Sequence, residues 1–433
     1  MATTRGTGAE VRIAITGAGA VTPIGIGVDG FLRGWRDGAL GIAEAPWAAH
    51  APLPLLTSRI PDGFDPVPAL GERVVAATDR CAQYALVAAD EALEQAGLHA
   101  PGVLDPMRTA VIDGTAAGGL HSIMLGQHRF DAGGVDAIPP KTMLAGQANM
   151  AAAQIAIRHQ LHGPLRTVTT ACAAGLDAVG AAVDLLALGR ADVVVCGGSD
   201  SAAVSDVEGF VPVFSIAGRV FGMETPELDP ARAVLPFDVA RRGIVFGEGA
   251  AWFVLETAEH AAARGAEALG WVLGVGSSAD GFHPSSPEPT GRWQAHAMEL
   301  ALADAGLEAA HVDVVMAHAT GTPKGDLAEA RALERVFWGQ ASAPPVTALK
   351  GHTGHTGGSS GAMSMLAALD VLRTGRVEPV RGTSEVDPEV SIDVVVGRPR
   401  RLDARVAMVN AFGFGGQNSC VVVGGRDHPG SAR

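Results

Sequence analysis

The clearest chemical signal in the sequence surrounds Cys172, in segment 169–175, which reads TTACAAG. This pattern predicts that a strand ends there, that small residues form a turn, and that an Ala-rich helix begins directly after the cysteine. A helix N-terminus offers unpaired N–H groups and partial positive charge, which lower the pKa of a thiol. A lone cysteine is more often a buried structural residue. The small neighbours, which would leave the sulfur accessible, favour a nucleophile at Cys172.

A second polar segment, AHATGTP at 317–323, follows the apolar run 312–316. Strand ends in α/β sheets are where ligands bind, so His318 is a candidate for chemistry. The hydroxyls of Thr320 and Thr322 suit the amides and hydroxyl of a phosphopantetheine arm. A histidine beside a turn is as often a solvated or capping residue, and this segment alone leaves both interpretations open.

A third segment, KGHTGHTGG at 350–358, contains one of only three lysines in the chain. Its glycines allow a ligand to approach the backbone closely. His352 and His355 are three residues apart and have no carboxylate nearby, so the segment is a poor metal site. It also lacks the Gly-Lys-Ser/Thr ending of a phosphate loop.

Two glycine-rich segments have simpler alternatives. Segment 410–418, NAFGFGGQN, predicts a tight hairpin between apolar strands, or else a backbone N–H donor for an oxyanion with Phe414 as a gate. Segment 16–22, TGAGAVT, resembles half of a dinucleotide fingerprint, but Thr22 replaces the third glycine and Pro23 follows. We interpret segment 16–22 as a strand-end turn without a cofactor role.

Short apolar runs that alternate with helical patterns must position these segments. They predict parallel sheets covered by helices on both faces. The predicted strands are 11–16, 109–113, 192–197, 252–256, 312–318, 406–410 and 419–423, and the predicted helices are 83–95, 173–188, 293–305 and 327–337. A second strand-and-helix series begins near Leu269, which suggests two similar halves: residues 1–258 with the cysteine, and residues 259–433 with the two histidine segments.

Composition narrows the class of protein. The net charge of −14 disfavours nucleic acids and anionic membranes as partners. No run of eighteen apolar residues could span a bilayer, and residues 1–10 lack the features of a secretory signal, so we expect a cytoplasmic protein. Cys81, Cys196 and Cys420 lie in helical or strand patterns and form no CxxC pair, which indicates buried structural thiols without a disulfide framework or zinc site.

Together the segments resemble the β-ketoacyl-acyl carrier protein synthases, the elongating condensing enzymes of fatty acid and polyketide biosynthesis. The resemblance covers nearly the whole chain and rests on order and spacing. Its matching segments are 15–25, 170–175, 236–238 (PFD), 247–250 (GEGA), 318–323, 350–355 and 412–416. It implies a thiolase-like α/β fold in which two duplicated halves form a five-layer α-β-α-β-α sandwich, and it implies a dimer.

The resemblance also implies roles in a decarboxylative Claisen condensation. Cys172 would accept the acyl group from an acyl carrier protein thioester, with the N–H groups of Cys172 and Phe414 holding the oxyanion. His318 and His355 would assist loss of CO2 from a malonyl thioester and stabilise the enolate, because a neutral imidazole can donate one hydrogen bond. Lys350 with Glu329 would orient His355.

The remaining implications concern support and partners. Asp326 would support the site, and Thr320 and Thr322 would bind phosphopantetheine. No metal or cofactor would be needed beyond the phosphopantetheine that carries the substrates. Acyl carrier protein would be the partner, and the dimer would be a homodimer or a heterodimer with a chain-length-factor-like subunit. Charged residues near the PFD and GEGA segments are expected to brace loops, namely Asp238, Arg241, Arg242 and Glu248.

Several positions depart from the family pattern. Ala319 replaces a usual glycine, Ala173-Ala174 follows the cysteine, and Gln417 precedes Asn418. These changes remove no reacting group, and they suggest a divergent, polyketide-dedicated enzyme. Segment 214–231 differs from the usual loop of the family, so the length of the acyl chain is not predicted.

The alternatives to an active elongating enzyme are a non-elongating acyltransferase and a chain-length-factor-like partner subunit. Such partner subunits typically lack the cysteine. A thiolase is disfavoured because Cys420 lies in a strand pattern.

Overall fold

The computed structural model describes residues 11–45, 55–201, 211, 216, 229–340 and 343–428. Its centre is one mixed eleven-stranded sheet made of two five-stranded halves, with β2 (Gly25–Ile26) paired beside β1. The first half has the order β1 (Ile13–Thr22), β8 (Gly249–Thr257), β7 (Val193–Asp200), β5 (Thr109–Gly114) and β6 (Leu165–Val168). The second has β9 (Gly270–Ala279), β15 (Gln417–Gly425), β14 (Val406–Gly413), β10 (Val314–Met316) and β11 (Val346–Thr347).

The strand orders show that the fold is duplicated. When the strands of each half are numbered in chain order, both halves have the same sheet order, 1-5-4-2-3. The halves join where Ile13–Ile15 of β1 pair antiparallel with Gly270–Val272 of β9. Topology therefore establishes the repeat that residue identity did not reveal. The boundary predicted between residues 258 and 259 falls at α10 (Ala258–Ala263), which connects β8 to β9, and it stays a prediction.

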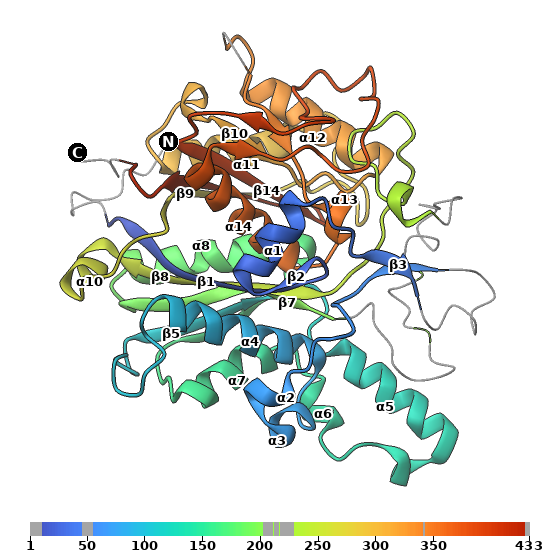
Figure 1. The fold of residues 1–433 in the computed structure, drawn as a ribbon, viewed down its shortest axis with the longest axis vertical. Helices are drawn as coiled ribbons and strands as arrows, with labels where there is room; N and C mark the ends of the chain where they lie inside the picture. Colours follow the sequence, from blue (N-terminus) through green and yellow to red (C-terminus); the bar gives the residue numbers. More distant parts are fainter. Residues whose placement is uncertain are drawn as a thin grey trace.

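Helices separate the two half-sheets and cover their outer faces (Figure 1). On the outside of the first half lie α4 (Arg80–Gln95) and α7 (Met150–His159). Between the halves lie α8 (Ala174–Ala187) and α14 (Ser359–Thr374), and α14 is buried from Ser359 to Val371. Outside the second half lie α11 (Arg292–Asp304) and α12 (Pro323–Val336). The predicted five-layer, thiolase-like α/β architecture is confirmed.

The expectation of parallel sheets is wrong in part. Strands β5, β6 and β7 are parallel, whereas β8 runs antiparallel to both of its neighbours. In the second half, a three-residue turn at 414–416 joins β14 to β15. Because so short a connection reverses the chain, the two strands must pair antiparallel. The predicted hairpin at 410–418 is confirmed, and the sheet is mixed.

Segment 16–22 is not the predicted strand-end turn, since β1 continues through it and is buried along its whole length. A Cβ at Gly17 would lie 2.0 Å from the carbonyl oxygen of Ala92, and one at Gly19 would lie 1.9 Å from that of Ala88. Both carbonyls belong to α4. The glycines therefore allow a helix to pack directly on the strand backbone, and the turn comes later, at residues 23–24.

The smaller elements connect and flank these layers. They are α1 (Gly27–Arg36), β3 (Ile42–Glu44), β4 (Leu56–Ser58), α2 (Val67–Leu70), α3 (Glu72–Val75), α5 (Leu120–Gly133), α6 (Thr142–Ala145), α13 (Lys350–Thr353), β12 (Arg376–Val377) and β13 (Arg400–Arg401). Single 3-10 turns occur at Val135–Ala137, Ala171–Ala173, Pro230–Arg232 and Ala309–His311. Among the helices that the structure describes, none combines the length and apolar character required to cross a membrane.

Candidate active site

A cavity of about 370 Å³ lies where the middle layer meets the second half-sheet. Three of the predicted reactive residues line it, namely Cys172, His318 and His355. Phe414, Thr320 and Thr322 also line it, while Lys350 is buried behind His318. The structure thus brings residues from distant parts of the sequence into one site.

Cys172 sits in a 3-10 turn, Ala171–Ala173, that leads into α8 at Ala174. The helix therefore starts slightly later than the sequence predicts. Ala171 has φ +50°, a left-handed conformation that costs energy for any residue with a Cβ. The end of β14 packs against this segment so closely that a Cβ at Gly413 would lie 2.7 Å from the carbonyl oxygen of Thr170. This packing holds the cysteine at the cavity wall.

The predicted lowering of the thiol pKa is wrong. Burial raises the pKa of Cys172 to about 11, although the Lys350 ammonium and N–H groups of Phe414 and Cys172 oppose that shift. Cys172 is only 7% exposed, so the loss of hydration raises the thiol pKa by more than the helix N-terminus lowers it. The free site therefore holds a neutral thiol near pH 7. The two N–H groups that hydrogen-bond the sulfur are those predicted for the oxyanion hole.

His318 is held by Lys350 and by Glu329, whose pKa burial raises to about 7. The Lys350 Nζ lies 3.3 Å from His318 Nδ1 and also donates to the His318 carbonyl oxygen. The Glu329 carboxylate accepts the N–H groups of His318 at 2.8 Å and Ala319 at 2.7 Å. Because an ammonium can only donate, Nδ1 of His318 must accept, which leaves its proton on Nε2. Burial and the Lys350 charge keep the pKa of His318 well below its usual range, so the ring is neutral.

His355 is fixed by its own loop. Its Nδ1 lies 3.0 Å from the Ser360 hydroxyl and accepts the N–H of Gly357 at 3.2 Å. The proton of the neutral ring is therefore on Nε2, which is buried without a partner among the described residues. Burial, followed by the Lys350 charge, keeps the pKa of His355 well below its usual range. Its ring centroid lies 5.4 Å from that of His318, so the site holds two neighbouring N–H donors.

Lys350 and Glu329 thus hold His318, and the prediction that they orient His355 is wrong. Register explains the difference: β10 and β11 are parallel, and Met316 pairs with Thr347. His318 follows its strand by two residues and Lys350 follows its strand by three, so both emerge at the same sheet edge. His355 lies five residues further along, in the loop between α13 and α14. Ser360, which positions it, was missed, although it follows the GHTGGS run directly.

Asp326 supports the His318 loop from beneath. Its carboxylate accepts the N–H groups of Phe237 at 2.7 Å and Gly321 at 3.0 Å, and burial raises its pKa to about 6. Above it, the hydroxyls of Thr320 and Thr322 are 2.9 Å apart and face the cavity, while Thr322 caps α12. These two hydroxyls are placed where an elongated ligand could meet them.

Some cavity residues were not predicted. Arg242 was expected to brace a loop, but it lines the cavity with His283 and Lys324. Asp238, Arg241 and Glu248 do brace loops: Asp238 accepts the N–H of Glu385 and Arg241 pairs with Asp387. Glu248 accepts the N–H of Ile60. Arg242 lies four positions after Asp238 in a segment predicted to brace loops, and nothing in the sequence indicated that it would line a cavity.

Asp200, at the end of β7, was also missed. Its carboxylate accepts N–H groups from Ala116 and Ala117 of the first half and from Gly358 of the second. It thereby fastens the loop that follows β5 to the end of the His355 segment, just before α14. A polar residue that ends an apolar strand could have indicated it. Outside the site, the ring of His352 lies 2.9 Å from the carbonyl oxygen of Ala39, and the three remaining cysteines are free and buried. Most of segment 214–231 lies outside the described residues.

Comparisons with known proteins match this architecture. The family model described as "Beta-ketoacyl synthase, N-terminal domain" matches residues 10–261, and "Beta-ketoacyl synthase, C-terminal domain" matches residues 269–384. The 3-oxoacyl-[acyl-carrier-protein] synthase 2 of Mycobacterium bovis is 37% identical over 323 residues, covering 74% of this chain and 75% of its own. A putative polyketide beta-ketoacyl synthase 1 of Streptomyces cyaneus is 36% identical, covering 96% and 98%. The solved ishigamide ketosynthase/chain length factor has a TM-score of 0.87 at 32% identity, covering 96% and 100%.

Proposed function

The chain belongs to the β-ketoacyl synthase family, and we propose that its cavity divides the condensation into a thiol step at Cys172 and an enolate step at the two histidines. The protein is a condensing acyltransferase that joins an acyl thioester on Cys172 to malonyl-ACP with loss of CO2. The observation that carries the division of labour is the pair of neutral imidazoles that line the same cavity as the thiol, each with its Nδ1 engaged as an acceptor.

In the first step the Cys172 sulfur attacks the carbonyl of a carrier-bound acyl thioester. The new oxyanion accepts the N–H groups of Cys172 and Phe414, which already reach the sulfur. Collapse breaks the carrier thioester and forms the Cys172 thioester, and the thiol proton leaves with the carrier's sulfur. Lys350 assists because its positive charge lowers the cost of forming the thiolate in a buried site.

In the second step malonyl-ACP occupies the emptied arm site. Loss of CO2 leaves an enolate whose oxygen accepts the Nε2–H groups of His318 and His355. Neutral donors suit this oxygen, because a charged imidazolium would protonate the carbanion that must form the bond. The enolate carbon attacks the acyl-Cys172 carbonyl, the oxyanion hole receives the second oxyanion, and the Cys172 sulfur departs and regains a proton.

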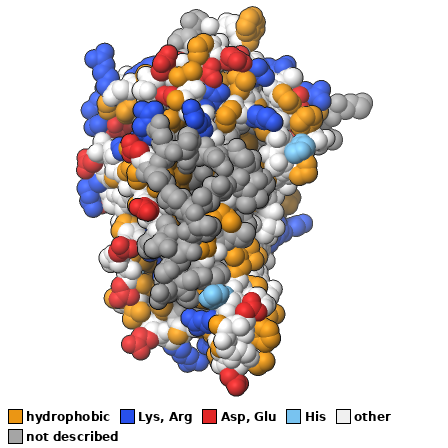
Figure 2. Space-filling view, turned by 90° about the vertical axis from the view of Figure 1, so that its right-hand side faces the viewer, with side chains coloured by type: hydrophobic (Ala, Val, Ile, Leu, Met, Phe, Trp, Pro, Cys, Tyr) orange, Lys and Arg blue, Asp and Glu red, His pale blue; other side chains and the backbone are white. Residues whose placement is uncertain are grey.

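The carrier arm enters past Thr320 and Thr322, whose hydroxyls are suited to its amides. Arg242 and Lys324 line the same cavity and offer positive charge to the phosphate of the arm. Figure 2 shows Lys and Arg side chains interspersed with acidic ones on one face, so a chain of net charge −14 still presents basic groups to a carrier protein.

The chain acts as the catalytic subunit of a dimer in the cytoplasm. Its partner is a second copy, or a chain-length-factor-like subunit such as the one named with the ishigamide ketosynthase. Retention of Cys172, His318, His355 and Lys350 supports catalysis by this chain in preference to a structural role. No metal takes part in these steps.

The test is a mass-spectrometric condensation assay with purified protein, acyl-ACP and malonyl-ACP. We expect an ACP-bound β-ketoacyl product two carbons longer, which requires malonyl-ACP. Acylated Cys172 without any extended product would instead indicate a non-elongating acyltransferase. Absence of both products with this chain alone, and their formation after a partner subunit is added, would show that the dimer is heteromeric.

A further inference from the structure

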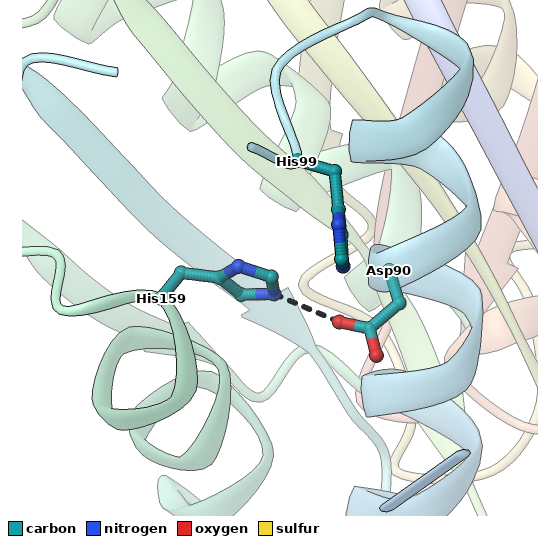
Figure 3. Close-up of side chains that lie close together, drawn as sticks. All are labelled: Asp90, His99 and His159. Carbon is teal, nitrogen blue, oxygen red and sulfur yellow. Dashed lines mark hydrogen bonds and ion pairs between the residues drawn. The ribbon is translucent and has the colours of Figure 1, made fainter. Parts of the chain in front are cut away.

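A cluster of two histidines and one aspartate lies outside the cavity, near the C-terminal ends of α4 and α7 (Figure 3). Asp90 projects from α4, His159 is the last residue of α7, and His99 follows α4 in a loop. One ligand atom from each residue lies within 4.8 Å of the others, and His159 Nε2 is 2.8 Å from Asp90 Oδ1. None of the three lines the catalytic cavity.

The donor set is chemically specific. Two imidazole nitrogens and one carboxylate oxygen are ligands that Zn²⁺ accepts, with water completing a tetrahedron. Metal–ligand bonds of about 2.0–2.1 Å place neighbouring ligand atoms about 3.3 Å apart. The present separations of 2.8 Å and up to 4.8 Å bracket that value. Small rotations of the exposed His99 side chain would therefore bring the three ligand atoms to this spacing without moving the helices.

The charges facing the cluster act in opposite directions. Arg158, next to His159 on α7, pairs with Asp90 through contacts of 2.8 and 3.0 Å and also donates to the Ala69 carbonyl. Its charge repels a cation. The carbonyl ends of α7 and α4, which carry partial negative charge, lie at His159 and shortly before His99, and they attract one. Arg158 can keep its contact with Asp90 while that carboxylate binds a metal.

We propose that Asp90, His99 and His159 form a Zn²⁺ site that fastens the end of α4 to the end of α7, with Arg158 limiting its affinity. The ion would replace the direct contact between His159 and Asp90 by two metal–ligand bonds. Both helices cover the outer face of the first half-sheet, so bound Zn²⁺ would stabilise the folded state and raise the melting temperature.

The test is zinc titration of the full chain by calorimetry, repeated in Cys172→Ala so that the reactive thiol is not the ligand. We expect one equivalent to bind with micromolar affinity in both proteins. His99→Ala, at an exposed position, should weaken binding by about tenfold or more. His296→Ala is the matched control, because His296 lies in another surface pair with Glu299 and should not affect binding.

Arg158→Gln completes the test, since it removes the repelling charge but keeps a donor for Asp90. We expect tighter zinc binding in this variant. Absence of zinc binding in the parent chain, or equal binding by the parent and His99→Ala, would show that the cluster is only an ion-pair network. Weaker or unchanged binding in Arg158→Gln would contradict the role given to Arg158.

Discussion

The two halves of the molecule share one strand order but carry different chemistry. Cys172 lies between β6 and α8, and His355 lies at the equivalent place in the second half, between β11 and α14. The N–H of Gly175 in α8 donates to the carbonyl oxygen of Gly358, which precedes α14, at 3.0 Å. Equivalent points of a duplicated fold therefore meet at the centre of the middle layer, one with the proposed nucleophile and one with a proposed hydrogen-bond donor.

The ends of two other equivalent strands differ as well. After β5 comes Thr115, whose hydroxyl donates to Asp200 at 2.9 Å and serves the structure. After β10 comes His318, held by Lys350 and Glu329. In the proposed reaction the first half holds the acyl group, while the second half supplies both imidazoles and the buried lysine. Duplication provides the scaffold, and the strand-end residues determine which half performs each step.

Removal of an imidazole from the second half should break this division most severely. We expect His355→Ala to lower the condensation rate by about 10²–10³-fold, because one of two donors to the enolate oxygen is lost. The extent of Cys172 acylation, monitored by intact-protein mass spectrometry, should change little in this variant. His352→Gln is the control, since His352 lies on the same segment outside the cavity. Equal losses of acylation and condensation would contradict the division.

The lysine should have a smaller effect with a characteristic pH dependence. Burial lowers the pKa of Lys350 to about 8, so the ammonium that fixes the His318 tautomer is lost as pH rises through that value. In single-turnover condensation from pre-acylated enzyme, the rate should fall as pH rises through the pKa of Lys350. Lys350→Met should be slower by about 10–100-fold at neutral pH and should lack this alkaline decline. A decline that persists in the variant would assign it to another group.

Separation of the two helix starts should sharpen the comparison. A Cβ at Gly175 would lie 2.5 Å from the Gly358 carbonyl oxygen, whereas a Cβ at Gly180, in the same helix, would meet only Val275 at 4.0 Å. Gly175→Ala should lower the free energy of unfolding by about 1–3 kcal/mol and reduce condensation. Gly180→Ala should be neutral or stabilising by up to about 1 kcal/mol. Denaturant titration checks both, and equal stabilities would refute the contact.

The smallest expected effect concerns Glu248 in the first half. Burial raises its pKa to about 7, so the folded state retains a proton that the unfolded state releases near pH 4.5. This contribution to stability is complete at low pH and is lost as pH rises through 7, by about 1 kcal/mol between pH 6 and 8. Glu248→Gln should lose that component of the pH dependence while activity persists. Parallel pH curves for the free energies of unfolding of variant and wild type would contradict it.

Residues near one another in the chain were the most predictable. The TTACAAG, AHATGTP and FGFGG segments give strand-to-turn junctions directly, because small residues and apolar runs determine local geometry. Partnerships across the fold were not predictable. Lys350 meets His318 through the register of β10 and β11, and Asp200 reaches Gly358 across the two halves. The prediction of a lowered thiol pKa was wrong for a similar reason, since the burial of Cys172 depends on layers far from it in sequence.

The most direct test of the account is CO2 release from malonyl-ACP, measured in Cys172→Ala and in His355→Ala. We predict that Cys172→Ala still releases CO2, because the proposed enolate site lies in the second half, although the variant forms no condensation product. His355→Ala should lose most CO2 release while still accepting an acyl group on Cys172. If CO2 release instead disappears with Cys172 and survives loss of His355, the two halves do not divide the reaction in this way.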